Sequence, residues 1–216
     1  VGNKNKLEII KEIHFPHSLG LLYSAFTYYT GFKVNSGEYK LMGLAPYGKP
    51  VFKDLIIEKL MDLKTDGSFK LNMEFFNYAT GLTMTNNKFS KLFGNPVRDA
   101  KRDLLTEFHM NIAASIQAVT EEIVLRLTKS ISKDYNVKNL CIAGGVALNC
   151  VANGKILKEK VFENIWIQPA AGDAGGSLGA ALAYWYHELK MPRNNYKDQM
   201  NGSYLGPKLE NNIIED

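Results

Sequence analysis

Two glycine-containing stretches decide the fold: Ala143–Asn149, which reads AGGVALN, and Ala171–Ser177, which reads AGDAGGS. Each follows a short apolar run and precedes a pattern typical of a helix. A strand that ends in glycines and opens a helix presents unpaired backbone N–H groups and the positive end of the helix dipole to an anion. The pair therefore predicts two neighbouring corners of one nucleotide and metal site, with the carboxylate of Asp173 in the second corner.

The segments before these turns predict the sheet. Asn139–Ala143 is a short apolar run that we interpret as a buried strand, and Asn164–Gln168 is a second apolar run that we interpret as a strand. A helix ending at about Lys160 separates them, and another helix follows the second turn. This alternation predicts parallel strands joined by right-handed crossovers, with ligands at the carboxyl ends of the strands. The fold class is therefore α/β, with a mixed sheet and crossover helices.

The rest of the chain adds mainly helices. Apolar residues recur at steps of three and four from Leu104 to Leu127, which predicts an amphipathic helix over about Asp99–Ser132. The weak pattern at about 64–98 suggests a small insertion with a hairpin. Before it we expect a strand over Leu7–His14, a helix over Leu19–Tyr29 capped by Ser18, loop and turn over Lys33–Pro50, and a helix over Val51–Leu63.

Composition excludes several classes of protein. The 216 residues are 45% hydrophobic and 22% charged, as in an ordinary globular protein, and the net charge of +4 is spread along the chain. We therefore expect neither a nucleic-acid nor a membrane partner, because no basic run or apolar segment of about 18–20 residues occurs. Cys141 and Cys150 do not form a CxxC pair, so we expect reduced, structural thiols and a cytoplasmic location.

The candidate site residues each have a simpler alternative. Gly144 and Gly145 would let a nucleotide approach the backbone, or they serve only a tight turn that needs positive φ. Asn149 could add a directional amide contact from the first helical turn. Asp173 is either an ordinary N-cap or a ligand of a divalent cation that lies between it and a phosphate. The sequence lacks GxGxxG and the Walker P-loop, so neither of these nucleotide sites is supported.

Three further polar residues are candidates for catalysis. His17 forms an HxxH pair with His14, but Pro16 breaks the helical geometry that would align the pair on a metal. We therefore expect a structural or substrate-contact role for His17. Glu38 and Lys40 lie in a glycine-rich stretch and are either polar substrate contacts or a solvated pair of little energetic value. As general base, His17 and Glu38 are the only candidates that we single out.

Four blocks in order along the chain resemble the O-carbamoyltransferase family, which includes the nodulation-factor, cephem and aminoglycoside antibiotic carbamoyltransferases. They are Pro16–Gly20 (PHSLG), Gly37–Gly48 (GEYKLMGLAPYG), Gly144–Cys150 (GGVALNC) and Gly172–Ala180 (GDAGGSLGA). The resemblance implies an actin, sugar-kinase and heat-shock ATPase-like (ribonuclease H-like) domain, similar to the domain that transfers threonylcarbamoyl groups to tRNA. It also implies that carbamoyl phosphate and ATP form carbamoyl adenylate, which then carbamoylates a hydroxyl of a small molecule or glycan.

The resemblance assigns roles residue by residue. Gly144, Gly145, Val146 and Asn149 would contact the adenylate, and Asp173 would bind a divalent metal, with iron as the expected ion. His17, Glu38 and Lys40 are the expected catalytic residues. A homodimer is one expected assembly. The competing functions are a sugar-type kinase on the same fold and a non-enzymatic, nucleotide-gated module.

The chain also departs from the family pattern. The HxxxH metal pair and the first phosphate loop of the family do not occur in these 216 residues, and we expect them upstream. We expect residues 1–205 to be part of the ATPase-like domain, and residues 206–216 to be a linker toward a C-terminal adenylate-forming domain. On this interpretation the chain is an internal fragment that is inactive alone.

Overall fold

The computed structural model describes residues 1–193, 200, 203 and 206–207. The chain divides into two compact units, one formed by Lys11–Asp173 and the other by Val1–Ile10 with Ala174–Asp216. We call them the main unit and the terminal unit and describe each by itself. The predicted linker at 206–216 lies outside the described residues beyond Pro207. Both units contain helices and short strands, which agrees with the predicted α/β class.

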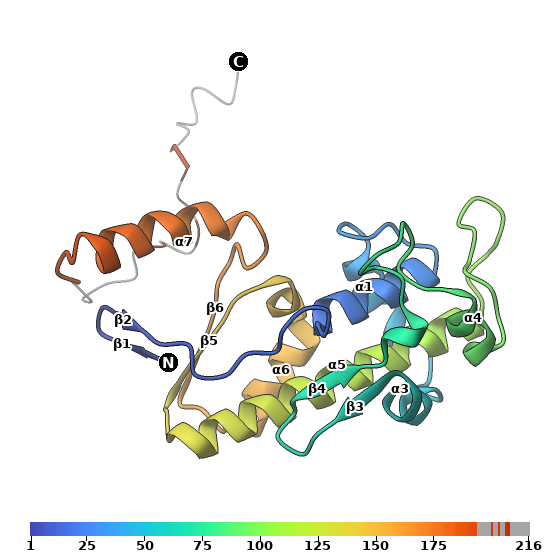
Figure 1. Ribbon diagram of the computed structural model, residues 1–216, viewed down its shortest axis with the longest axis horizontal. Helices are drawn as coiled ribbons and strands as arrows, with labels where there is room; N and C mark the ends of the chain where they lie inside the picture. The colour runs from blue at the N-terminus through green and yellow to red at the C-terminus, as the bar shows by residue number, and fades with distance from the viewer. Residues whose placement is uncertain (194–199, 201–202, 204–205, 208–216) are drawn as a thin grey trace, which may run out of the picture. The chain divides into compact units, whose positions relative to one another are not determined.

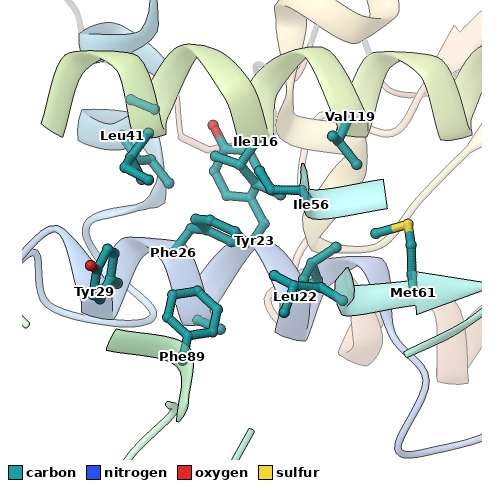
Figure 2. Close-up of a cluster of buried hydrophobic side chains, with 14 of the residues drawn as sticks. Leu22, Tyr23, Phe26, Tyr29, Leu41, Ile56, Met61, Phe89, Ile116 and Val119 are labelled. Atoms are coloured by element: carbon teal, nitrogen blue, oxygen red, sulfur yellow. The ribbon is translucent and has the colours of Figure 1, made fainter. Parts of the chain in front are cut away.

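The core of the main unit lies between helices α1 (Leu19–Tyr29) and α5 (Glu107–Tyr135). Leu22 and Phe26 of α1 and Ile116 of α5 are fully buried. Figure 2 shows Phe26 and Tyr23 pointing from α1 toward α5, with Ile116 and Val119 on the facing side. The apolar spacing predicted from the sequence therefore packs these two helices against each other, as Figure 1 also shows.

The beginning of α1 confirms its predicted cap. Ser18 Oγ accepts a 3.2 Å hydrogen bond from the backbone N–H of Leu21, which satisfies one of the free donors of the first turn. The helix ends at Thr30, and Gly31 then adopts a φ of +79°, a left-handed conformation that glycine adopts without strain. The predicted bounds, Leu19–Tyr29, match the observed ones.

The next segment is more helical than predicted. The stretch predicted as loop at 33–50 contains helix α2 (Glu38–Leu44) and the short 3-10 helix η1 (Ala45–Tyr47). Its glycines fall at the edges of α2 and on its exposed side, at Gly37 and Gly43, where they do not break the helix. The helix predicted over 51–63 ends early, because α3 (Lys53–Leu60) gives way to strand β3 (Met61–Leu63).

The segment at 64–98 contributes to the core. Strand β4 (Phe69–Leu71) pairs antiparallel with β3, so this hairpin begins before the segment rather than within it, and the 3-10 helix η2 (Met73–Phe75) and helix α4 (Asn87–Phe93) follow. Phe89 of α4 is fully buried, with its ring centroid 5.1 Å from that of Phe26 and 5.0 Å from that of Tyr29. Whether this segment is an insertion relative to the family stays a prediction.

Helix α5 begins eight residues later than the sequence pattern suggests. Thr106 caps it, and Nδ1 of His109 accepts the backbone N–H of Thr106 over 3.1 Å. This reciprocal arrangement is a capping box, which fixes the first turn of a helix. Leu104, the first residue of the apolar repeat, lies before the cap and is 84% exposed. The prediction of a helix from Asp99 was therefore wrong at its start.

Strands β5 (Asn139–Ile142) and β6 (Asn164–Ile167) are parallel neighbours, as predicted. The 3-10 helix η3 (Gly145–Leu148) and helix α6 (Cys150–Glu159) connect them, and α6 packs against α5. The prediction that the first strand is buried was wrong, because Asn139 and Cys141 of β5 are exposed and Leu140 and Ile142 are only half-buried. Trp166 of β6 is 42% exposed. A two-stranded parallel sheet lacks the layers that normally cover both faces of such sheets.

The terminal unit contains a short hairpin of β1 (Gly2–Asn3) and β2 (Lys6–Leu7), helix α7 (Gly175–Ala183) and the π-helical turn η4 (Tyr184–Glu188). The Asn5 side chain, in the turn of the hairpin, donates a 2.8 Å hydrogen bond to the carbonyl oxygen of Met191. The predicted strand over Leu7–His14 was wrong, because residues 8–14 have no regular structure. Its apolar residues alternate as in a strand, but no neighbouring strand pairs with them among the described residues.

Candidate functional site

The two glycine turns meet at the carboxyl ends of β5 and β6. The backbone N–H of Gly144 donates to the carbonyl oxygen of Ala171 over 2.7 Å. Because the strands are parallel, both turns leave the sheet at the same edge. The structure therefore confirms that the turns are adjacent, and the part of the second turn up to Asp173 belongs to the main unit.

The backbone conformation of the first turn requires glycine at position 144 but not at position 145. Gly144 has φ 100° and ψ 168°, a region that essentially only glycine populates. Gly145 has no positive φ, and a Cβ placed on it would meet no heavy atom within 4 Å. The backbone conformation thus explains glycine at 144, whereas nothing among the described residues requires it at 145.

Two backbone N–H groups of this turn are open. Gly145 and Val146 begin η3, and no acceptor for either N–H occurs in the described part of the chain. Gly145 is exposed and Val146 is half-buried. A ligand oxygen at this exposed helix start could accept both hydrogen bonds, which is the arrangement that anion sites use.

The first turn of α1 lies against this loop. A Cβ placed on Gly20 would lie 3.7 Å from Cγ2 of Val146, so the helix start and the glycine turn are in close contact. His17 immediately precedes the N-cap of this helix. The structure therefore brings the PHSLG block and the first glycine turn into one neighbourhood.

His17 is half-buried and fixed by one hydrogen bond. Its Nδ1 accepts the backbone N–H of Leu71 over 3.1 Å. Since a backbone N–H can only donate, Nδ1 carries no proton, and the neutral ring must carry its proton on Nε2. In this arrangement the second ring nitrogen is a hydrogen-bond donor, which favours a contact to a substrate oxygen over proton abstraction.

Asn149 is buried, with 8% of its surface exposed. Its Oδ1 accepts the backbone N–H of Ala152 over 3.0 Å and so caps α6. Its Nδ2 donates to Oε1 of Gln117 over 2.9 Å, and Nε2 of Gln117 donates back to Oδ1 over 3.1 Å. Both ends of the amide are therefore engaged within the protein, and direct contact with a nucleotide stays a prediction.

Sequence reasoning missed Gln117. It lies beside the apolar stripe of α5, directly after Ile116, and is only 5% exposed. A long polar side chain next to the apolar positions of a helix was the available signal. That signal is weak, because such residues commonly lie at the solvent boundary.

Glu38 and Lys40 have different surroundings. Oε1 of Glu38 accepts the hydroxyl of Ser24 over 2.8 Å and the backbone N–H of Asn35 over 3.0 Å, so the carboxylate ties α1 to the start of α2. Lys40 is exposed, with its ammonium 5.9 Å from the ring centroid of Tyr39, and it forms no ion pair with any described residue. Their predicted catalytic roles stay predictions.

Asp173 is exposed at the end of the main unit. Metal sites in proteins need several ligands in a defined geometry. No group of three or more His, Cys, Asp or Glu side chains placed to hold a metal occurs within the described residues. These residues therefore do not fit a complete metal site, and we assign no chemical step to a metal. The role of Asp173 as a single ligand stays a prediction.

Cys141 and Cys150 both have free thiols. Both are exposed, and neither packs in the core as a structural cysteine would. Across the part of the chain that the structure describes, no helix is long and apolar enough to cross a bilayer.

Comparison with known proteins identifies the family. The sequence model described as the carbamoyltransferase N-terminus matches residues 1–182, which include both glycine turns and the PHSLG and GEYK blocks. The chain therefore belongs to the carbamoyltransferase family, as the four sequence blocks predicted.

Several curated relatives match nearly the whole chain. An uncharacterised protein of Synechocystis, sll1178, is 64% identical over 215 residues, which cover 99% of this chain and 35% of the relative. Nodulation protein NolNO of Sinorhizobium fredii is 32% identical over 97% of this chain and 28% of its own length. NolO of Bradyrhizobium diazoefficiens is 34% identical over 94% of the chain and 34% of its length. The chain thus spans about a third of the length of these relatives.

Proposed function

We propose that the full-length protein transfers a carbamoyl group from carbamoyl adenylate, made from carbamoyl phosphate and ATP, to a hydroxyl of a small molecule or glycan. Membership of the carbamoyltransferase family supports the transfer, and the acceptor class is the one that the family resemblance implies. The observation that carries the proposal is the glycine turn beside Ala171, with two open backbone donors and free space at Gly145.

The turn suits the phosphate of an adenylate. The N–H groups of Gly145 and Val146 would donate to a phosphate oxygen, and the lack of a Cβ at 145 would let the phosphate reach them. Donors fixed before the reaction stabilise a charge that develops on the leaving group without reorganisation. Asn149 caps α6 and forms two hydrogen bonds with Gln117. These bonds would fix the position of the turn from its buried side.

The proposed transfer needs no reactant other than carbamoyl adenylate and the acceptor hydroxyl. The acceptor oxygen attacks the carbamoyl carbon, the bond from this carbon to the AMP oxygen breaks, and AMP leaves with the bonding electrons. The proton of the acceptor hydroxyl passes to a base. His17, with its proton on Nε2, would donate a hydrogen bond to the carbamoyl or phosphate oxygen. Glu38 would then remain the candidate base, although its carboxylate already accepts hydrogen bonds from Ser24 and Asn35.

The whole-domain architecture belongs to the same proposal. We infer that β5, β6 and α6 are part of an actin and sugar-kinase-like sheet whose other strands lie elsewhere in the longer protein. The exposed faces of β5 and β6 support this, because parallel strands are normally covered on both sides. The homodimer, the cytoplasmic location and the metal at Asp173 stay predictions.

The test uses the full-length protein with ATP, carbamoyl phosphate and a panel of hydroxyl acceptors. Pyrophosphate release that requires carbamoyl phosphate supports the proposal, whereas ADP formation with a sugar would indicate a kinase. Nucleotide binding with no carbamoyl-dependent product would indicate a nucleotide-gated module.

A pair of glycine substitutions tests the turn itself. Gly145→Ala should leave the fold intact and weaken binding of AMP, the leaving group of the adenylate, about tenfold or more, which corresponds to about 1.4 kcal/mol. The matched control is Gly154→Ala in α6, where a Cβ also meets no atom within 4 Å. It should leave AMP affinity unchanged. Wild-type AMP affinity in both variants would remove the turn from the proposed site.

A further inference from the structure

A chain of buried hydrogen bonds joins α1, α5 and the start of α6. The hydroxyl of Tyr23 donates to Oε1 of Gln117 over 3.0 Å, and the same oxygen accepts Nδ2 of Asn149 over 2.9 Å. Tyr23, Gln117 and Asn149 are 6%, 5% and 8% exposed. Figure 2 shows the Tyr23 oxygen directed from α1 toward α5. Burial, helped by the negative charge of Glu121, raises the pKa of this hydroxyl, which therefore remains a donor at neutral pH.

One backbone group fixes the direction of every bond in this chain. The N–H of Ala152 can only donate, so the atom of Asn149 that it contacts must be the oxygen. Nδ2 of Asn149 must then donate to Oε1 of Gln117, and Nε2 of Gln117 must donate in return. Neither amide can rotate by half a turn without setting two donors against each other.

Gln117 also holds a charged group in place. Its Nε2 donates to Oε1 of Glu121 over 2.8 Å, one helical turn further along α5. The other carboxylate oxygen of Glu121, which is 6% exposed, accepts from the ammonium of Lys155 on α6. A buried polar network of this kind stabilises one arrangement only when all its members are satisfied.

This network ends at the proposed adenylate turn. The backbone N–H of Asn149 donates to the carbonyl oxygen of Val146 over 3.0 Å and closes η3, while its side chain begins α6. Asn149 is therefore the residue through which the network can fix the direction of the Gly145 and Val146 N–H groups.

We propose that Gln117 is a positioning residue that orients the glycine turn through Asn149, with Tyr23 and Glu121 holding Gln117 itself. The inference rests on the proposed function for the ligand of the turn, but the position of the turn can be measured without that ligand. Gln117 touches no substrate in this account and acts only through Asn149.

The test compares Gln117→Glu with the double variant Gln117→Glu/Glu121→Gln in the full-length protein. The single change replaces a donor by a second carboxylate beside Glu121. The double change exchanges the two groups, so that residue 121 again offers a donor to residue 117 and the net charge is unchanged. Thr128→Val is the control, because the Thr128 hydroxyl is buried on α5 but bonds only to carbonyl oxygens of its own helix.

Two measurements decide the outcome. Gln117→Glu should accelerate hydrogen exchange in peptides covering 143–152 and weaken AMP binding to the full-length protein about tenfold, with kcat at saturating substrates changed less than about twofold. The double variant restores the donor between residues 117 and 121 but not the bond from Nε2 of Gln117 to Oδ1 of Asn149, so it should recover only part of both losses, and Thr128→Val should show neither. Unchanged exchange and unchanged AMP affinity in Gln117→Glu would overturn the positioning role.

Two further outcomes keep the test decisive. If Gln117→Glu does not fold, Tyr23→Phe removes a single hydrogen bond and should give the same changes at a smaller size, whereas wild-type exchange at 143–152 in Tyr23→Phe would count against the network. If the wild-type protein neither binds ATP nor shows carbamoyl-dependent turnover, the proposed function fails. Exchange at 143–152 then still decides whether Gln117 positions the turn.

Discussion

The backbone N–H of Gly144 donates to the carbonyl oxygen of Ala171 over 2.7 Å, and this bond joins the turns that follow two parallel strands. At this junction Gly144 has φ 100° and ψ 168°. For a residue with a Cβ, this backbone conformation costs about 1–3 kcal/mol of strain energy. The junction of the two turns therefore depends on glycine for its backbone shape.

Gly144→Ala should accordingly lower the stability of the main unit by about 1–3 kcal/mol and weaken AMP binding in the full-length protein. If the strained turn relaxes by moving the 144–171 contact, it displaces the open donors at Gly145 and Val146. Chemical unfolding and equilibrium AMP binding measure the two effects.

The control for this prediction is Gly94→Ala. Gly94 is also left-handed, with φ 74° and ψ 9°, but it ends α4 and has open space around it. Its substitution should cost about 1–2 kcal/mol of stability and leave AMP affinity unchanged. A loss of AMP affinity in both variants would mean that general destabilisation, not the turn, explains the result.

Glu38 and Lys40 should respond differently to substitution. Glu38→Gln keeps the shape of the side chain but points an NH₂ group at one of the donors from Ser24, Asn35 or Gly37, which should cost about 1–3 kcal/mol of stability. Lys40→Ala removes an exposed ammonium and should change stability by less than about 0.5 kcal/mol.

Activity separates a catalytic role from this structural one. If Lys40→Ala lowers kcat of the full-length enzyme without a change in stability, Lys40 contacts substrate as the sequence predicted. If Glu38→Gln is stable but inactive, the carboxylate acts in the reaction rather than at the start of α2. Full activity in Lys40→Ala would remove Lys40 from the catalytic candidates.

The segment at 64–98 should be indispensable for folding of the main unit. Phe89 is fully buried and its ring packs edge-on against Phe26 and Tyr29 of α1. Phe89→Ala should therefore lower the free energy of unfolding by about 3–5 kcal/mol. Chemical unfolding measures this cost. Leu82→Ala, at a fully exposed position of the same segment, is the control and should be close to neutral. A small cost at Phe89 would support a dispensable insertion.

Helix bounds were predicted correctly where the residues that start and end the helix were both visible in the local sequence. Ser18 and Gly31 bracket α1, and the observed helix has the predicted bounds because its cap and its left-handed exit are both local. For α5, the apolar repeat extended to Leu104, but the capping box at Thr106 and His109 determined where the helix begins. Periodicity predicts the buried face of a helix but not its first turn.

The site was predictable only in part, for a related reason. The adjacency of the glycine turns follows from parallel strands, whose order of connection is visible in the sequence. The partner of Asn149 is not visible, because Gln117 lies 32 residues away and meets it only after α5 and α6 have packed. Similarly, the engagement of His17 Nδ1 depends on the hairpin strand that carries Leu71.

His109 gives the capping box of α5 a dependence on pH. Its Nδ1 can accept the Thr106 N–H only while it is unprotonated, and burial, followed by the charge of Arg98, lowers the pKa of His109 below its usual value of 6.5. Between the folded and the unfolded pKa, the unfolded chain binds more protons than the folded chain. Stability is therefore complete above about pH 6.5 and falls as the pH drops from 6.5 through the lowered pKa of the folded state.

His109→Gln should remove this dependence. The glutamine oxygen can accept the Thr106 N–H at any pH, as in the usual capping box, so stability at pH 7.5 should stay within about 0.5 kcal/mol of wild type. Chemical unfolding at several pH values between 7.5 and 5 should show a steeper decline in the wild type than in the variant. Parallel declines would show that other groups cause the acid sensitivity. A large loss in the variant at pH 7.5 would show that the ring packs in a way that glutamine does not replace, since His109 also stacks edge-on against Phe108 at 5.4 Å.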